Sequence, residues 1–272
     1  TTGSSLNTLH LNTEPTWRGG EQQMCYLARG LSALGHGATI LCPEESPCFA
    51  RAAELGLDVR PFSTGGDLDL LAARRVAKIA DDLQTDIVHA HTSKTLFPAS
   101  ACKRFTSRPV HTIAHRRVDF SIHKLPFRLS GLKYRWGVDR FIAITEAVKQ
   151  VMIADGIPAE RIRVVHSSTD IGRFDNVRRN PAVRRELGIP EKAKLVGNVA
   201  ALVGHKGQRY LLDAIPIVLE SAPRTFFLIL GEGPLRDELE AQAQRLGITH
   251  NLRMPGFRAD VPQCLAEMDV FC

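Results

Sequence analysis

The stretch 195–232 constrains the fold more than any other part of the chain. Residues 195–199 and 226–230 are short runs, mostly apolar or glycine, flanked by turn-prone residues, and both are predicted to be buried strands. Apolar side chains recur at helical spacing between them, at Tyr210, Leu211, Ala214, Ile215 and Val218. A strand, a helix and a second strand in this order form a βαβ unit, which predicts a parallel sheet.

The loop that opens this helix carries Gly204, Lys206 and Gly207 at the carboxyl end of the first strand. Open α/β sheets bind ligands at that edge, beside helix N-termini that suit phosphate groups. Lys206 would supply a mobile positive charge for a diphosphate. A solvated lysine at a helix start is an equally consistent interpretation, because the loop contains neither a complete P-loop nor a G-x-G-x-x-G motif.

Length and composition indicate a globular chain with an anionic partner. The 272 residues suit two α/β domains, and the contents of 44% hydrophobic and 24% charged residues are ordinary. The formal net charge of +6 favours an anionic partner without identifying it. The six scattered cysteines form no C-x-x-C pair, which is typical of reduced, cytoplasmic proteins. We find no membrane span or signal peptide, and the start, TTGSS without Met, suggests a trimmed terminus.

Eleven strands are predicted, in two groups. The first group comprises residues 6–12, 38–42, 58–62, 86–91, 109–114, 140–144 and 161–165, and the second comprises residues 194–199, 225–230, 252–254 and 269–272. Helical segments alternate with these strands, among them 21–34, 47–55, 68–83 and a helix capped by Thr145. The fold class is therefore α/β, with two Rossmann-like, doubly wound parallel-sheet domains.

The charged, Asn- and Pro-bearing stretch 173–192 interrupts the pattern and is predicted to be the hinge. It would separate an N-terminal domain, residues 1–172, from a C-terminal domain, residues 193–272. Because the last predicted strand has no successor, we expect the second domain to be incomplete and the chain to be truncated at both ends.

Polar residues at strand ends in the first domain are further candidates. The paired Gly19 and Gly20 would let the backbone approach a ligand closely, although for a Gly-Gly pair alone a plain turn is the favoured interpretation. His89 and His91 share a strand face and could ligate a metal, but no third ligand lies nearby in the sequence, so we predict no metal site. His91, at the point where residues 86–91 leave the strand, is the better candidate for a polar site role.

A basic segment follows these strand ends. Ten Lys or Arg residues lie between 103 and 140 against two aspartates, and residues 123–136 mix aromatic and aliphatic side chains with cations. Such a segment could lie on an anionic membrane surface, or it could form a helix packed on its own domain with its basic face in water.

Seven segments, in order, resemble the retaining glycosyltransferases of family 4, which have the GT-B fold. They are RGGEQ, DIVHAHTSK, FIAITEAVKQVM, RIRVVHSSTDIGRF, VGNVAALVGHKGQRYLLDA, FLILGEGPLRDELEAQAQRLGI and MPGFRADVPQCLAEMDVF. The resemblance covers nearly the whole chain. It implies transfer of a sugar from a nucleotide-diphosphate sugar with retention at the anomeric carbon and with no essential metal or other cofactor. The donor would lie mainly on the second domain and the acceptor mainly on the first.

The resemblance also assigns roles to residues. Lys206 matches the family's diphosphate-binding lysine and would neutralise charge on the leaving phosphate. His115 matches the active-site histidine, with Arg116 as an alternative register. The positions that match loops around the donor are Gly19, Gly20, Gly231, Glu232, Gly233, Gly256 and Phe257.

Two departures from the family pattern stand out. The usual arginine five residues before the lysine is replaced by Ala201, and Arg116 or Arg117 could supply the missing phosphate cation. The E-x7-E segment that holds the donor sugar in the family would follow residue 272. Residues 1–272 alone are therefore expected to be inactive.

The resemblance predicts envelope or polysaccharide assembly with a glycan or lipid-linked acceptor, in the cytoplasm and peripherally at the inner membrane face. Alternatives are a GT-B nucleotide-sugar 2-epimerase and a non-catalytic nucleotide- or nucleic-acid-binding protein. A nucleic-acid partner is not expected, because the sequence shows no recognition helix, RNP-like aromatic pair or zinc-ligand spacing. A dinucleotide oxidoreductase is disfavoured because no strand is followed by G-x-G-x-x-G.

Overall fold

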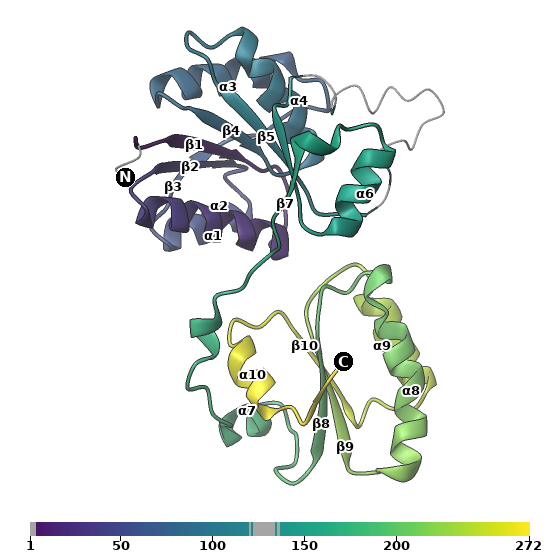
Figure 1. Cartoon of the computed structure of the whole chain (residues 1–272). Helices are drawn as coiled ribbons and strands as arrows, with labels where there is room; N and C mark the ends of the chain where they lie inside the picture. Colours follow the sequence, from purple (N-terminus) through teal and green to yellow (C-terminus); the bar gives the residue numbers. More distant parts are fainter. Residues whose placement is uncertain (1–3, 120, 122–133, 135–136) are drawn as a thin grey trace. The chain divides into compact units, whose positions relative to one another are not determined.

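The computed structural model describes residues 4–119, 121, 134 and 137–272. The chain divides into two compact units, Thr1–Thr169 and Asp170–Cys272, and each unit is built around its own parallel sheet (Figure 1). The predicted α/β fold with two separate parallel sheets is therefore confirmed, and a single continuous sheet is excluded.

The first unit contains a seven-stranded sheet in the order β3-β2-β1-β4-β5-β6-β7, with every pair parallel. Its strands are β1 (Asn7–Leu11), β2 (Gly37–Cys42), β3 (Asp58–Pro61), β4 (Ile87–Ala90), β5 (His111–Arg116), β6 (Arg140–Ala143) and β7 (Ile162–Val164). All seven predicted strands are present. The order places β1 beside β4, which is the arrangement of the doubly wound dinucleotide-binding fold.

Helices cover both faces of this sheet. Those in the described residues are α1 (Gly19–Ala33), α2 (Pro47–Glu54), α3 (Leu70–Asp82), α4 (Ser93–Ala101) and α6 (Glu146–Ala154), with short 3₁₀ turns at Cys102–Arg104 and Ala159–Arg161. Figure 1 shows α1 and α2 on one face and α3 and α4 on the other. Leu9 and Leu11 of β1 belong to the core beneath α3 and α4. Because strand side chains alternate, His10 lies on the opposite face, the one that α1 and α2 cover.

Side-chain caps explain where three of these helices begin. The Oγ of Ser46 accepts a hydrogen bond from Phe49 N, and Asp69 accepts one from Ala72 N. Thr145, predicted as a cap, accepts a hydrogen bond from Val148 N at 3.1 Å. Each bond satisfies a backbone N–H that has no partner within the helix.

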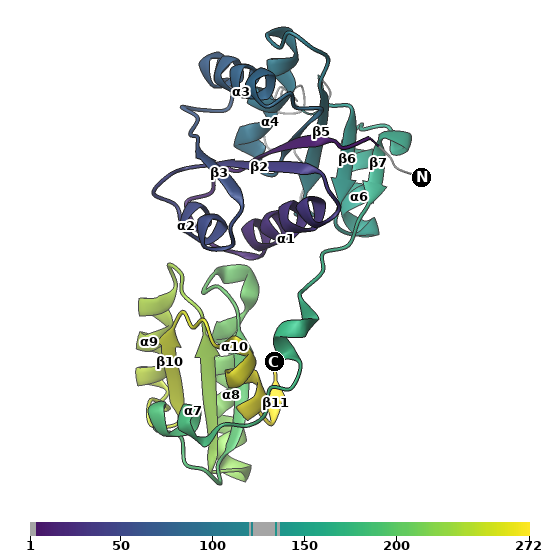
Figure 2. The ribbon, with the colours of Figure 1, turned by 90° about the vertical axis from the view of Figure 1, so that its left-hand side faces the viewer.

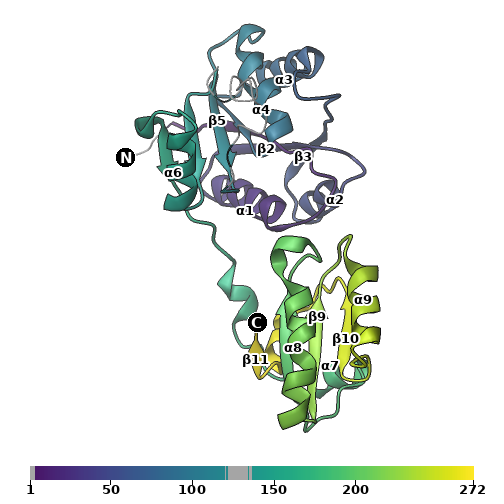
Figure 3. The same ribbon diagram turned by 90° about the vertical axis from the view of Figure 1, so that its right-hand side faces the viewer.

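The second unit contains a four-stranded sheet in the order β10-β9-β8-β11, again with parallel pairs. Its elements are α7 (Pro181–Glu186), β8 (Lys194–Val199), α8 (Gln208–Ser221), β9 (Thr225–Leu230), α9 (Arg236–Arg245), β10 (Leu252–Gly256), α10 (Val261–Glu267) and β11 (Val270–Phe271), with 3₁₀ turns at Ile171–Phe174 and Gly204–Lys206. Helices α7 and α10 lie on one face of the sheet (Figure 2), and α8 and α9 lie on the other (Figure 3). All six residues of β9 are buried, as the apolar run predicts for a central strand.

The stretch 173–192, predicted as a hinge, contains α7, and the unit boundary falls earlier, between Thr169 and Asp170. Val183 and Leu187 pack in the core of the second unit. The guanidinium of Arg184 is buried and bonds to Glu267 of α10, with 2.7 Å between Nε and Oε2. Much of the predicted hinge is thus a structural part of the second unit.

The basic segment 123–136, for which a membrane contact is predicted, lies outside the described residues except for Tyr134. Among the described residues, no helix is both long and apolar enough to cross a membrane.

The Arg184–Glu267 pair predicts a large and local loss of stability on mutation. Glu267→Ala should destabilise the second unit by about 3–5 kcal/mol, because it removes the carboxylate that hydrogen-bonds to the buried guanidinium and leaves it with the more distant Asp269, whose Oδ2 lies 3.8 Å from Nη2. Hydrogen exchange of the β8 and β9 amides in urea reports on this unit alone. The control Glu238→Ala removes an exposed carboxylate and should change little. Equal protection of those amides in both variants would contradict a stabilising role for the pair.

Candidate functional site

The carboxyl edge of the first sheet gathers several of the predicted residues. The loop between β1 and α1 is held by the buried Glu21, whose carboxylate accepts hydrogen bonds from Asn12 Nδ2 at 3.0 Å and Arg18 N at 2.8 Å. These bonds fix the backbone where α1 begins at Gly19 and Gly20. The predicted Gly19–Gly20 loop therefore has a defined position at a helix N-terminus, where negative charge is favoured.

Arg117 lies against this loop. A Cβ built on Gly20 would meet its Cδ at 3.7 Å. Its Nη1 donates to the backbone oxygen of His91 at 3.1 Å, its Nη2 contacts Nδ1 of the same residue at 3.0 Å, and Nδ1 of His115 is 3.5 Å away. These partners are neutral, and within the described part of the chain no carboxylate pairs with the guanidinium. Burial lowers the pKa of Arg117 to about 10, and nearby Glu21 opposes this shift.

Arg116 points away from this group, although the sequence leaves Arg116 and Arg117 as alternatives. Side chains alternate along β5, so Arg116 lies on the sheet face opposite to His115 and Arg117. Its guanidinium is buried and donates to the hydroxyl of Tyr134 at 3.3 Å, and its Cζ lies 5.7 Å from the centroid of that ring. Of the two arginines, only Arg117 joins His91 and His115.

A cluster of histidines lies beside Arg117 and includes one that the sequence did not indicate. His10 of β1 is in register with His89 of β4, and its ring centroid lies 5.4 Å from that of His91. The ring of His115 is parallel to that of His89, with centroids 5.6 Å apart. The prediction that no third ligand lies near His89 and His91 is therefore wrong, because the pairing of β1 with β4 brings in His10. Nitrogens of these three residues lie within 4.8 Å of one another, close enough to be considered for a metal.

Burial controls the charge of this cluster. It lowers the pKa of His10 to about 4 and that of His115 to about 3, and it lowers the pKa values of His89 and His91 well below the usual range. The positive charge of Arg117 lowers the values of His89, His91 and His115 further. All four imidazoles are therefore neutral at pH 7, and Arg117 carries the positive charge of the group.

In the second unit, two loops at the carboxyl edge of the sheet fit together closely. A Cβ on Gly231 would lie 2.0 Å from the backbone oxygen of Ala200, and one on Gly233 would lie 2.4 Å from that of Leu202. Gly231 also has φ = 141°, which disfavours other residues. Leu202 N donates to Glu232 O at 2.9 Å. The loop after β9 thus packs directly on the loop that leads to Lys206, and glycine is required at both contacts.

The remaining predicted residues of this unit join the same edge. Gly231 N donates to Gly256 O at 3.0 Å, and Phe257 N donates to Oε1 of Glu232 at 3.4 Å. Phe257 is exposed, as is Lys206 on the 3₁₀ turn before α8. The structure therefore brings Gly231, Glu232, Gly256 and Phe257 together, next to the loop that carries Lys206. The side chain of Ala201 provides no charge there.

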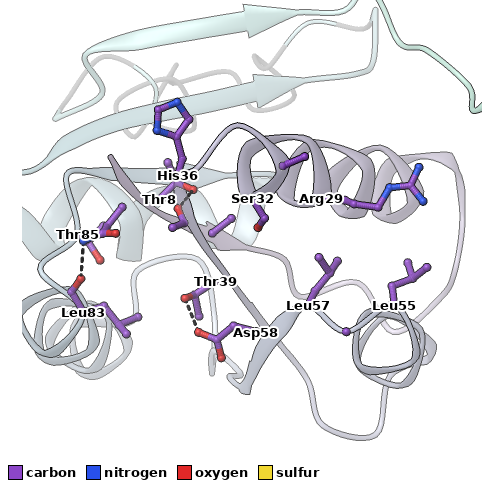
Figure 4. Close-up of a pocket in the computed structure, with 15 residues that line it drawn as sticks. Thr8, Arg29, Ser32, His36, Thr39, Leu55, Leu57, Asp58, Leu83 and Thr85 are labelled. Carbon is purple, nitrogen blue, oxygen red and sulfur yellow. Dashed lines mark hydrogen bonds between the residues drawn. The ribbon is translucent and has the colours of Figure 1, made fainter. Parts of the chain in front are cut away.

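A pocket elsewhere in the first unit contains none of the predicted site residues. It lies at the amino end of the strands, where Thr8, Thr39, Asp58 and His36 line it (Figure 4). The hydroxyl of Thr39 donates to Oδ2 of Asp58 at 2.6 Å, so this carboxylate already has a hydrogen-bond partner within the protein. Ligands of doubly wound sheets bind at the opposite, carboxyl edge, so this pocket is not the candidate site.

Comparison with protein families gives two matches. A family model described as Glycosyltransferase Family 4 matches residues 17–173, and one described as Glycosyl transferases group 1 matches residues 180–272.

Curated relatives and solved structures agree with these matches. The lipopolysaccharide core biosynthesis glycosyltransferase LpsE of Rhizobium meliloti is 29% identical over 152 residues, which cover 56% of this chain and 42% of LpsE. The 2-deoxystreptamine glucosyltransferase of Streptomyces kanamyceticus is 27% identical over 50% of this chain and 37% of its own length. The chain thus spans less than half of these relatives. The crystal structure of Anabaena HepE in complex with UDP-glucose has a TM-score of 0.79 at 23% identity, covering 98% of this chain and 73% of HepE.

The neutral histidines predict that the first unit loses stability as the pH falls. Between 6.5 and about 4, the unfolded chain binds a proton at His10 that the folded chain does not. This difference in proton binding lowers the free energy of unfolding. The loss from His10 alone is absent above about pH 7 and approaches about 3 kcal/mol near pH 4. His10→Gln should therefore reduce the fall in urea midpoint between about pH 7 and 4.5.

The exposed His166 provides a control. In His166→Gln, the fall in urea midpoint between about pH 7 and 4.5 should be the same as in the unmodified chain. If His10→Gln and His166→Gln gave the same profile, the neutral, buried state of His10 would be contradicted.

Proposed function

The chain belongs to glycosyltransferase family 4, and we propose that the protein transfers a sugar from a nucleotide-diphosphate donor to a glycan or lipid-linked acceptor, with retention of anomeric configuration. The observation that carries the proposal is Arg117, a largely buried guanidinium with neutral partners, at the N-terminus of α1. A cation that is desolvated without a carboxylate is suited to binding an anionic ligand. The relative LpsE, named for lipopolysaccharide core biosynthesis, supports an acceptor of this class.

We assign the phosphate cation that Ala201 cannot provide to Arg117 rather than Arg116. The side chain of Arg116 is already engaged with Tyr134 on the other face of the sheet. Arg117 presents its charge beside Gly20 at the carboxyl edge, where the backbone can approach a ligand without obstruction. This role concerns the donor diphosphate, which carries the charge that the reaction must stabilise.

Lys206 has the complementary role in the second unit. It is exposed on a short turn that immediately precedes α8, so its ammonium is free to follow the leaving phosphate as charge develops. His115, whose neutral imidazole faces the same edge as Arg117, would contact the transferred sugar. No step in this scheme uses a metal or another cofactor. The protein would act in the cytoplasm, peripherally at the inner membrane face.

A donor screen tests the proposed reaction. The full-length protein should hydrolyse or transfer from one class of nucleotide sugar, and the product should keep the anomeric configuration of the donor. Lys206→Ala should reduce turnover by about 100-fold or more, because it removes charge stabilisation that is greatest in the transition state. Lys192→Ala, which removes an exposed lysine of the same unit, should not. Epimerised nucleotide sugar without transfer, or inverted product, would contradict the proposal.

Arg117→Ala should weaken the binding of the cognate nucleoside diphosphate by about 10- to 100-fold, because this factor corresponds to the free energy of one hydrogen bond between charged groups. Calorimetry on the full-length protein measures this affinity, and circular dichroism checks the fold. Arg104→Ala removes an exposed arginine of the same unit and serves as the control. Unchanged affinity in Arg117→Ala would exclude this residue as the phosphate cation.

A further inference from the structure

A series of hydrogen bonds runs through the first unit, from its carboxyl edge to its amino edge. Arg117 Nη2 contacts His91 Nδ1 at 3.0 Å, His91 Nε2 contacts His10 Nδ1 at 3.1 Å, and His10 Nε2 contacts Thr8 Oγ1 at 3.0 Å. Thr8 Oγ1 then donates to Gly37 O at 2.9 Å. Thr8, His10 and His91 are all buried. Figure 4 shows Thr8 at the amino end, in the pocket wall.

The two ends of this series fix the direction of every bond in it. A guanidinium can only donate and a carbonyl can only accept. Because the Thr8 hydroxyl proton is used on Gly37 O, its oxygen must accept from His10 Nε2, which therefore carries a hydrogen. His10 Nδ1 is then bare and accepts from His91 Nε2–H. His91 Nδ1 is bare in turn and accepts from Arg117. Each donor meets one acceptor without conflict.

We propose that Thr8, His10 and His91 act as positioning residues that hold the guanidinium of Arg117 in place for an anionic substrate group. This role of Arg117 rests on the proposed function, whereas the bond directions do not. Reversing His91 would turn an N–H toward the guanidinium and oppose two donors at 3.0 Å. A second bond, from Arg117 Nη1 to His91 O, anchors the other terminal nitrogen to the same residue. The neutral histidines thus orient the guanidinium and leave its positive charge available. A carboxylate in their place would neutralise that charge.

The environment maintains the neutral forms that these bonds require. Within the described part of the chain, the charged or titratable groups that face His10 and His91 are His89 from β4, His115 from β5 and Arg117 after β5. None of them is an acid that would stabilise an imidazolium. Burial lowers the pKa of His10 to about 4 and that of His91 well below its usual range.

The same geometry disfavours a metal ion at His10, His89 and His91, although their nitrogens are close. A zinc ion would need bare nitrogens at about 2.0–2.1 Å. If His91 Nε2 were such a ligand, the ring hydrogen would move to Nδ1 and face the N–H of Arg117. The fixed charge of Arg117 would also repel the ion. The hydrogen-bond series gives every nitrogen of His10 and His91 a suitable partner, whereas metal ligation would place two N–H groups against each other.

Ring-nitrogen NMR of the full chain tests the bond directions without any substrate. At pH 7, His10 and His91 should both show a bare Nδ1 and a protonated Nε2, with assignments from His10→Gln and His91→Gln. An Nδ1–H form or an imidazolium at either residue would overturn the proposal. Stoichiometric zinc binding that shifts both residues would overturn it in favour of a metal site.

Thr8→Val tests the positioning role, because it removes the acceptor of His10 Nε2–H and keeps the side-chain shape. We expect the full-length protein to bind the cognate nucleoside diphosphate about 3- to 10-fold more weakly, and Thr8→Ser to restore binding. The control Thr39→Val removes a buried threonine hydroxyl of the same pocket wall that bonds to Asp58 instead, and it should leave affinity unchanged. Equal losses in Thr8→Val and Thr39→Val, or no loss in Thr8→Val, would contradict positioning.

The two proposals fail in distinguishable ways. If the ring nitrogens are as described but Arg117→Ala leaves nucleotide affinity unchanged, the bond series stands and the phosphate role of Arg117 fails. If Arg117→Ala weakens binding but His91 carries its hydrogen on Nδ1, the phosphate role stands and the positioning proposal fails.

Discussion

The parallel pairing of β1 with β4 is the constraint on which the candidate site of the first unit depends. The register sets His10 opposite His89, and it brings the loops after both strands to one edge of the sheet. β5 pairs with β4 in the same direction and adds His115 and Arg117. Residues 20, 91 and 117 are far apart in the chain, yet they meet because parallel strands share their carboxyl edge. The pairing of β8 with β9 has the same effect in the second unit, where the loop after β9 packs on the loop leading to Lys206.

Arg184 and Arg117 are both largely buried, but they have different kinds of partner. Arg184 bonds to the carboxylate of Glu267 and to four backbone oxygens nearby, so its charge is neutralised and it joins α7 to α10. Among the residues that the structure describes, Arg117 has two histidines as its hydrogen-bond partners, and its Nε is buried with no partner. Desolvating a charge without an opposite charge is costly, and such an arrangement is typical of functional sites rather than structural ones. We interpret Arg184 as structural and Arg117 as functional on this physical difference.

The sequence predicts the strands well because apolar runs bounded by turn residues suffice to specify buried parallel strands, as in β9. The sequence gives no bounds for α4 and predicts a hinge where α7 lies, both for local reasons. α4 begins with Ser-Lys-Thr and contains Pro98, and α7 lies in a charged stretch whose few apolar residues, such as Val183, show no clear period. The glycine loops and the histidines of β4 and β5 could be identified as candidates. His10 could have been found from the doubly wound strand order, which places the first strand beside the fourth.

Other properties of the site could not be obtained from sequence patterns. The choice between Arg116 and Arg117 depends on which face of β5 meets α1, and this is set by packing across the sheet. The neutral state of the histidines depends on burial and on the charge of Arg117, and their hydrogen positions depend on partners from three different strands. These are tertiary properties. They decide the chemistry of the site, because they determine where its positive charge lies.

The central claim is that this charge binds the phosphates of a nucleotide donor. The most direct measurement compares the affinities of the full-length protein for the cognate nucleoside, its monophosphate and its diphosphate at several salt concentrations. If the charge of Arg117 binds these phosphates, affinity should rise with each phosphate by about tenfold or more per step, and the gain should decrease with salt. Equal affinity for the nucleoside and its diphosphate would contradict it.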